Sequence, residues 1–200
     1  MPHQRKEKIP VSRLFQLSYA IWHEIWASFD LYILCLRRKD KYLRKRGARI
    51  GFTCDLVTDV INFGTEPYLI RMGNEVTVTS GVKFITHDGS TRLFRKRFPS
   101  MNKYGNLFAP IIIGNNCFIG INAILLPGTV LGDDTIVGAG AIVKGEFPSN
   151  SVIASVPARR LFSVDEYIDK IQNNMIPLQA KNREALRQEL IAHFFKFENS

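Results

Sequence analysis

Hydrophobic and small residues recur at an interval of six positions between Ile111 and Pro148. Written in sixes from position 113, the chain reads IGNNCF, IGINAI, LLPGTV, LGDDTI, VGAGAI and VKGEFP. Each unit begins with an aliphatic residue, and its fifth position is small in most units. Because side chains alternate along a strand, the fifth position of one unit and the first of the next point the same way. We therefore expect one inward-facing row: Cys117, Ile119, Ala123, Leu125, Thr129, Leu131, Thr135, Val137, Ala141 and Val143.

The residues between these inward pairs are typical of tight turns. They read Gly-Asn-Asn, Pro-Gly, Gly-Asp-Asp and Gly-Ala-Gly, and such residues favour turns because they adopt the required backbone angles. Short strands joined by tight turns at a constant interval indicate a solenoid. The pattern predicts a mainly β protein, a parallel β-helix of hexapeptide repeats.

A second row of large apolar residues falls on the outward positions of the same strands. A free-standing β-helix carries polar side chains there, so a complete apolar row predicts that neighbouring subunits or the chain's own helices cover it. The alternative is that single apolar residues are ordinary on a protein surface. The row consists of Phe118, Ile124, Val130, Ile136 and Ile142.

The repeat extends upstream and is interrupted once. Residues 50–67 resemble a degenerate first coil with Cys54 at an inward position, and the phase slips at residues 62–68. Three clear hexads follow from Met72, and we expect Val76, Val78, Val82 and Phe84 to face inward. Residues 88–109 lack the repeat, and loops of this length are usually functional or disordered. The aromatic residues of this insertion predict an ordered flap.

The repeat separates two helical ends, so we expect three regions: residues 1–49, 50–161 and 162–200. Residues 11–46 show a helical pattern with an aromatic face and a basic tail, but His23, Glu24 and Asp30 break any membrane span. This segment either caps the β-helix, the favoured interpretation, or lies on an anionic membrane surface. At the other end, Ser163 and Glu166 form a capping box that begins a helix.

Composition limits the class of partner. The chain has 27 Lys and Arg against 18 Asp and Glu, a formal net charge of +9, which favours an anionic partner such as nucleic acid, a membrane surface or a phosphorylated small molecule. No known module that reads nucleic acid is visible. The cysteines Cys35, Cys54 and Cys117 are widely spaced and suit reduced thiols of a cytosolic protein. Residues 1–10 are polar, without a secretory signal, so we expect a cytoplasmic location, with peripheral contact to the membrane left open.

Specific motifs within residues 50–161 resemble the left-handed β-helix hexapeptide acyltransferases. The motifs are the aliphatic-Gly hexads, Thr86-His87-Asp88 before the long insertion, Val137-Gly-Ala-Gly, and Ser155-Val-Pro-Ala-Arg. Residues 63–70 together with 85–89 look most like the branch that acetylates sugars of surface polysaccharides. The resemblance implies a homotrimer of three-sided prisms that uses acetyl-CoA, with active sites between subunits. It implies O-acetylation of a sugar in capsule, exopolysaccharide or O-antigen biosynthesis.

His87 matches the catalytic histidine of this family. The chemistry requires a base near neutral pH that removes a hydroxyl proton while the oxygen attacks a thioester, and imidazole suits this task. Asp88 and Glu66 are candidates to orient the ring. A backbone N–H would stabilise the oxyanion, and the sequence leaves open which one.

The resemblance also implies where coenzyme A binds. Gly120, Ile121 and Ala139 match the family positions whose backbone contacts the pantetheine arm, and Arg159 matches the residue that meets the nucleotide phosphates. The chain departs from the family pattern at Lys144-Gly145, where Thr-Lys is usual, and at Ser155-Val156, where Gly-Asn is usual. Lys144 and Arg160 are therefore further candidates for the phosphate contact.

Other functions remain to be weighed against acetyl transfer. A β-helix zinc hydratase needs three histidine ligands, and of His3, His23, His87 and His193 only His87 lies in the repeat, so we expect no metal. A non-catalytic oligomerisation module stays open. The acceptor stays open as well, because a sugar hydroxyl, an amino-sugar nitrogen and a xenobiotic hydroxyl all suit the same base.

Overall fold

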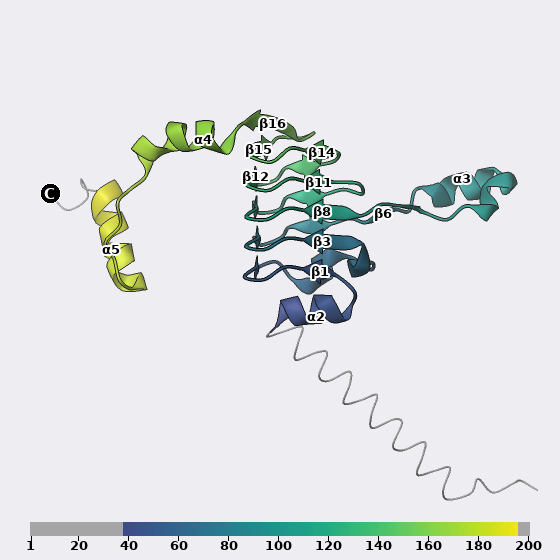
Figure 1. The fold of residues 1–200 in the computed structure, drawn as a ribbon, viewed down its shortest axis with the longest axis horizontal. Helices are drawn as coiled ribbons and strands as arrows, with labels where there is room; N and C mark the ends of the chain where they lie inside the picture. The colour runs from purple at the N-terminus through teal and green to yellow at the C-terminus, as the bar shows by residue number, and fades with distance from the viewer. Residues whose placement is uncertain (1–37, 196–200) are drawn as a thin grey trace, which may run out of the picture. The chain divides into compact units, whose positions relative to one another are not determined.

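The hexapeptide segment folds into short parallel strands that stack into three sheets. The computed structural model describes residues 38–195, and Figure 1 shows β1, β3, β8, β11 and β14 lying one above the next. Sheet A contains β1 (Arg49–Ile50), β3 (Ile70–Met72), β8 (Ile111–Ile113), β11 (Val130–Leu131) and β14 (Glu146–Phe147). Sheet B contains β2 (Asp55–Leu56), β4 (Thr77–Val78), β9 (Phe118–Ile119), β12 (Thr135–Val137), β15 (Ser151–Ala154) and, antiparallel at its edge, β16 (Arg159–Phe162). Sheet C contains β5 (Lys83–Phe84), β10 (Ile124–Leu125) and β13 (Ile142–Val143).

The chain visits the three sheets in the order A, B, C and then repeats the order one level higher. Ile113 pairs with Leu131 in sheet A, and Ile119 pairs with Val137 in sheet B. Each pair is separated by three hexads, so three hexads complete one coil. This register confirms the predicted parallel β-helix of hexapeptide repeats, because a six-residue period makes equivalent residues stack directly above one another.

The predicted inward row forms the core. Ile119, Ala123, Leu125, Val137 and Val143 are fully buried, and the other members of the row retain at most 2% of their surface. Val76, Val78, Val82 and Phe84 continue the core below them. Two of the inward residues are threonines, and each satisfies its hydroxyl by donating to a backbone carbonyl, as Thr129 does to Val143 O at 2.9 Å. Burial raises the pKa of the Cys117 thiol to about 11, so Cys117 is a neutral core residue.

The outward row stays partly exposed on the β-helix. Phe118 keeps 46% of its surface, and Ile124, Val130, Ile136 and Ile142 are half-buried. That another subunit covers this row remains a prediction.

The degenerate first coil is confirmed, and its phase slip has a structural cause. After β1 and β2 the chain forms two short 3₁₀ helices, η1 (Val60–Phe63) and η2 (Pro67–Leu69), where the higher coils have a strand of sheet C. Phe63 still fills the inward position, because its ring stacks on that of Phe84 with centroids 4.4 Å apart. The residues between η1 and η2 therefore lie directly below the corner that follows β5.

The insertion forms an arm built on an antiparallel pair of strands. β6 (His87–Asp88) pairs with β7 (Leu107–Phe108), and between them lie α3 (Thr91–Arg97) and η3 (Pro99–Lys103). Arg95 ties the arm together, because its guanidinium donates to Tyr104 O at 3.1 Å. In Figure 1 the arm leaves the stacked coils at β6 and ends in α3.

The helical ends are described in part. α2 (Lys39–Lys45) contributes the fully buried Leu43 to the core next to β1; the rest of the helix predicted for residues 11–46 lies outside the described residues. α4 (Val164–Ile171), η4 (Gln172–Asn174) and α5 (Arg183–Phe194) follow β16. The chain divides into two compact units at residues 164 and 165. None of the described helices is long and apolar enough to cross a bilayer.

Candidate active site

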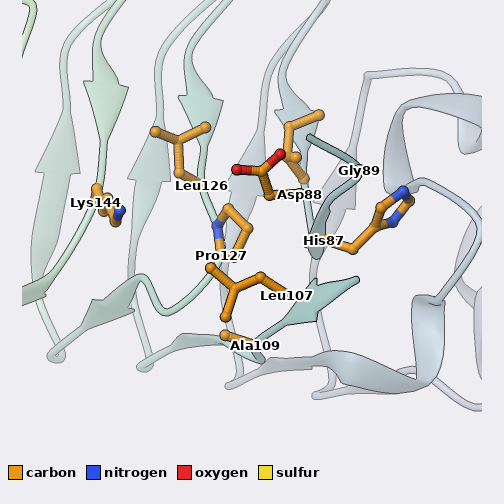
Figure 2. Close-up of a pocket in the computed structure, with 9 residues that line it drawn as sticks. His87, Asp88, Gly89, Leu107, Ala109, Leu126, Pro127 and Lys144 are labelled. Atoms are coloured by element: carbon orange, nitrogen blue, oxygen red, sulfur yellow. The ribbon is translucent and has the colours of Figure 1, made fainter. Parts of the chain in front are cut away.

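A pocket lies at the corner where sheet C ends, beside the start of the arm. The register of sheet C aligns Phe84 with Leu125 and Leu125 with Val143, so the residues that follow these three stack in the same way. The pocket has a volume of about 370 Å³. Figure 2 shows His87 toward one end of the view, Lys144 toward the other, and the Asp88 carboxylate between them. The lining consists of Ile85, His87, Asp88, Gly89, Leu107, Ala109, Leu126, Pro127 and Lys144.

Glu66 holds the imidazole of His87. The Glu66 Oε2 atom lies 2.9 Å from His87 Nδ1, although the two residues are 21 positions apart. Because an ionised carboxylate can only accept, Nδ1 must carry the hydrogen, and the lone pair of the neutral ring is on Nε2. About a third of the His87 side chain is exposed (35%), against 13% for Glu66. The ring is therefore oriented from behind while its other face remains accessible.

Hydrogen bonds keep the Glu66 carboxylate ionised. Burial by itself would raise the pKa of Glu66, but hydrogen bonds from Thr65, His87 and Thr86 outweigh it and hold the pKa below its ordinary value. The hydroxyl of Thr65 donates to Oε1 at 2.6 Å, and the hydroxyl of Thr86 donates to Oε2 at 2.8 Å. A carboxylate so placed stabilises the imidazolium that forms when His87 accepts a proton.

Asp88, the other candidate to orient His87, has a different set of contacts. Its Oδ1 atom accepts the backbone N–H of Ser90 at 2.8 Å. This bond, a second one from Ser90 and the nearby charge of Lys144 lower the pKa of Asp88. Asp88 therefore stabilises the turn at the base of the arm and contributes a negative charge to the pocket, whereas Glu66 makes the contact with the histidine ring.

The residues proposed for coenzyme A lie mainly at another corner. Gly120, Ile121 and Ala139 stack where sheet B turns into sheet C: the Gly140 N–H donates to Ile121 O at 2.7 Å, and a Cβ on Gly120 would lie 2.6 Å from Ala139 N. Only glycine permits so close an approach of the two coils. Arg159 pairs with Ala154 in the coil above, at the same edge. The backbone groups of this corner are thus lined up along the axis of the β-helix.

The structure separates the other two candidate cations from this corner. Lys144 lines the pocket with His87. Arg160 donates from Nε to Ser151 Oγ at 3.1 Å and from Nη2 to Asn150 O at 3.4 Å, at the opposite edge of sheet B. Arg160 is therefore engaged in closing the last coil, whereas Arg159 is exposed and pairs with Ala154, which follows the last inward residue of β15.

Sequence reasoning missed the two threonines that hold Glu66. Thr86 is 1% exposed, and a hydroxyl at an inward position directly before a candidate base is the signal that could have identified it. Thr65 carries no comparable signal, because it lies in the irregular segment between η1 and η2. No cluster of three or more histidine, cysteine or acidic side chains that could bind a metal is present in residues 38–195.

Comparison with known proteins places this β-helix in a family. Residues 110–145 match the model for the bacterial transferase hexapeptide, six repeats. Protein CapG of Staphylococcus aureus is 44% identical over 148 residues, which cover 72% of this chain and 83% of that protein. The chain therefore belongs to the hexapeptide-repeat transferase family.

Shorter segments of the chain are similar to acetyltransferases. The galactoside O-acetyltransferase of Escherichia coli (strain K12) is 39% identical over 67 residues, a third of each chain (33%). A putative lipopolysaccharide biosynthesis O-acetyl transferase, WbbJ, from the same strain is 45% identical over 49 residues, covering 24% of this chain and 25% of that one. Among solved structures, a galactoside acetyltransferase in complex with coenzyme A is 27% identical, covers 62% of this chain and 58% of that one, and superposes with a TM-score of 0.47.

The hydrogen bond from Thr86 generates a prediction about the ionisation of Glu66. Thr86→Val removes a donor to the charged form of Glu66, so the pKa of Glu66 should rise. Because its pKa is lowered in the folded protein, Glu66 contributes stability above its ordinary pKa that is lost as the pH falls through the folded value. The variant should therefore lose part of this stability at neutral pH and show a weaker dependence on acid.

Carbon-13 NMR titration of the Glu66 carboxyl, with urea unfolding at pH 7 and pH 4, measures both effects. Thr79→Val is the matched control, because its hydroxyl donates to Ile119 O at 2.6 Å away from the site. An unchanged Glu66 pKa in Thr86→Val would contradict the assignment.

Proposed function

We propose that this protein transfers an acetyl group from acetyl-CoA to a hydroxyl group of a sugar. The observation that carries the proposal is the Glu66–His87 pair, which presents an unprotonated Nε2 beside a pocket. The names of two similar proteins, a galactoside O-acetyltransferase and a putative lipopolysaccharide biosynthesis O-acetyl transferase, support both the reaction and the class of acceptor.

In the proposed mechanism His87 is first a general base and then a general acid. Nε2 accepts the proton of the acceptor hydroxyl while its oxygen attacks the thioester carbonyl and forms the new C–O bond. The Glu66 carboxylate stabilises the resulting imidazolium through Nδ1. When the tetrahedral intermediate collapses, the C–S bond breaks, and the imidazolium returns the proton to the departing thiolate. A backbone N–H stabilises the oxyanion in the intermediate.

We further propose that coenzyme A follows the corner formed by Gly120, Ile121 and Ala139 toward Arg159. This corner lies where the chain enters the strands of sheet C, and the corner of His87 lies where the chain leaves them, so the two corners are at opposite ends of these strands. A homotrimer would place the His87 corner of one subunit against the coenzyme corner of its neighbour. Such an assembly would explain why the outward row is apolar although it is partly exposed in a single chain. Lys144, which lines the same pocket as His87, would then contact the coenzyme from the other subunit.

The proposed setting is the biosynthesis of a surface polysaccharide in the cytoplasm. The similarity to a putative lipopolysaccharide biosynthesis transferase supports this assignment. A screen of sugars, amino sugars and xenobiotic alcohols with radiolabelled acetyl-CoA tests it. Transfer to sugar hydroxyls is expected, and transfer only to amino groups would contradict it.

The mechanism predicts the effect of removing the base. His87→Ala should lower the rate of acetyl transfer by about 10²–10⁴-fold, the usual contribution of a general base, while leaving the affinity for coenzyme A unchanged. Steady-state rates and calorimetric binding separate the two effects.

Glu66→Gln provides the matched comparison for the base. It retains the shape of the side chain but loses the charge that stabilises the imidazolium, so it should lower the rate less than His87→Ala does. If His87→Ala kept more than about a tenth of the wild-type turnover, His87 would not be the base.

The position of Arg159 predicts how the protein distinguishes coenzyme A from dephospho-coenzyme A, which lacks the 3′-phosphate. A guanidinium can donate two parallel hydrogen bonds to a phosphate. Arg159→Ala should remove most of the preference for coenzyme A, about 1–3 kcal/mol, in calorimetric titrations with both ligands. Arg160→Ala is the control, and a wild type without any preference would place the nucleotide elsewhere.

The outward row predicts that the protein is a trimer. Ile136→Glu should dissociate it, because the substitution places an unpaired charge in a dry interface. Ile136→Val should leave the assembly intact, because it keeps the face apolar. Static light scattering at micromolar concentration measures both masses, and a monomeric wild type would disprove the prediction.

A further inference from the structure

The arm, residues 88–109, is the most strongly basic exposed segment near the candidate active site. It contains five basic residues and one acidic residue, Asp88. Within the described part of the chain, none of the five basic side chains forms an ion pair. Arg95 is bonded within the arm to Tyr104 O and Asn106. The remaining four cations are exposed and have no acidic partner among residues 38–195: Arg92, Lys96, Arg97 and Lys103.

The arm also exposes large apolar and aromatic side chains among these cations. Leu93 is 68% exposed, Tyr104 54% and Phe98 49%; Phe94 and Met101 are exposed as well. Two cations lie directly over rings, since the Arg97 guanidinium is 5.5 Å from the centroid of Phe98 and the Lys103 ammonium is 5.2 Å from that of Tyr104. A surface that combines cations with exposed apolar side chains suits a partner that is negatively charged and also offers apolar contact.

We propose that the arm docks on an anionic lipid bilayer. Leu93, Phe98 and Tyr104 would enter the boundary between headgroups and acyl chains, and Arg92, Lys96 and Arg97 would contact the lipid phosphates. Aromatic residues and cations combine in this way in segments that lie in the membrane interface. The charge of the arm complements the negative surface of such a bilayer.

Charge favours an anionic bilayer over a second copy of this chain as the partner of the arm. A second copy carries a formal net charge of +9, so the cations of the arm gain more from an anionic lipid surface than from that copy. The outward residues that could serve as a subunit contact, Ile124 and Ile136, lie on the β-helix and supply no negative charge to the arm.

Docking of the arm has a consequence for the acceptor. His87 directly precedes the arm and Asp88 is its first residue, and Leu107 returns along them to line the same pocket. A bound arm therefore holds the pocket near the lipid surface, and we infer an acceptor saccharide that is anchored in the bilayer by a lipid. This consequence rests on the proposed acetyl transfer, whereas lipid docking does not.

Vesicle flotation with the full chain tests the docking. Wild type should bind vesicles of phosphatidylcholine that contain phosphatidylglycerol and should bind pure phosphatidylcholine weakly, and added salt should weaken the binding. Arg92→Gln/Lys96→Gln should bind the anionic vesicles roughly 30-fold more weakly, because each basic residue at the surface is worth about fivefold. Leu93→Ser should lose roughly tenfold, because it removes a buried apolar side chain.

Lys181→Gln/Arg183→Gln is the matched control, since it removes the same charge from exposed positions outside the arm. Its binding should equal that of wild type. The proposal is overturned if wild type does not prefer anionic vesicles, if the control loses as much as the arm variant, or if the arm variants keep their binding. If wild type does not bind vesicles and the arm variants differ from it in mass by light scattering, the partner of the arm is a second copy.

Acetyl transfer to a water-soluble sugar separates this inference from the proposed function. The arm variants should keep the wild-type rate with such an acceptor. Failure of transfer in wild type would refute the proposed function and leave the vesicle result standing. Absence of vesicle binding by wild type, with transfer intact, would refute only the docking.

Discussion

The structure depends on the direct stacking of one coil on the next. Gly114 shows how close this stacking is, because a Cβ added there would lie 2.6 Å from Asp133 N in the coil above. Neighbouring corners are then joined by side chains: Asp133 Oδ1 accepts the Asn115 N–H, and Asn115 Oδ1 accepts the Asn74 N–H at 2.9 Å. Since the backbone of every coil is bonded to its neighbours, equivalent residues align along the axis whatever their side chains.

The candidate active site arises where the chain departs from this regular stack. In the first coil two 3₁₀ helices replace a strand and bring Glu66 to the corner below β5. In the next coil the arm begins at the same corner, directly after His87. The regular coils above supply Leu126 and Lys144 to the same pocket by stacking alone. Periodicity therefore places the site, and two interruptions of the periodicity supply its chemistry.

The charged residues also differ between the regular coils and the segments that interrupt them. The candidate contact for coenzyme phosphate, Arg159, extends from the last strand beside the glycine-rich corner. The arm concentrates exposed cations away from the core, where water solvates them at little cost. Within the site, by contrast, the partly buried carboxylate of Glu66 accepts hydrogen bonds from two hydroxyls and an imidazole, which compensate for its loss of water.

The sequence by itself named His87 as a candidate base, which stays a prediction, and it determined the β-helix, the inward row from Cys117 to Val143 and the degenerate first coil. These follow from a period of six, because alternation along a strand and a constant coil length assign each residue to a face. Only the tertiary structure decided that Glu66, and not the adjacent Asp88, contacts the ring of His87. It also placed Lys144 in the pocket and tied Arg160 to Ser151. The reason is that irregular segments such as residues 60–69 carry no period, and their side chains are positioned by the coil above them.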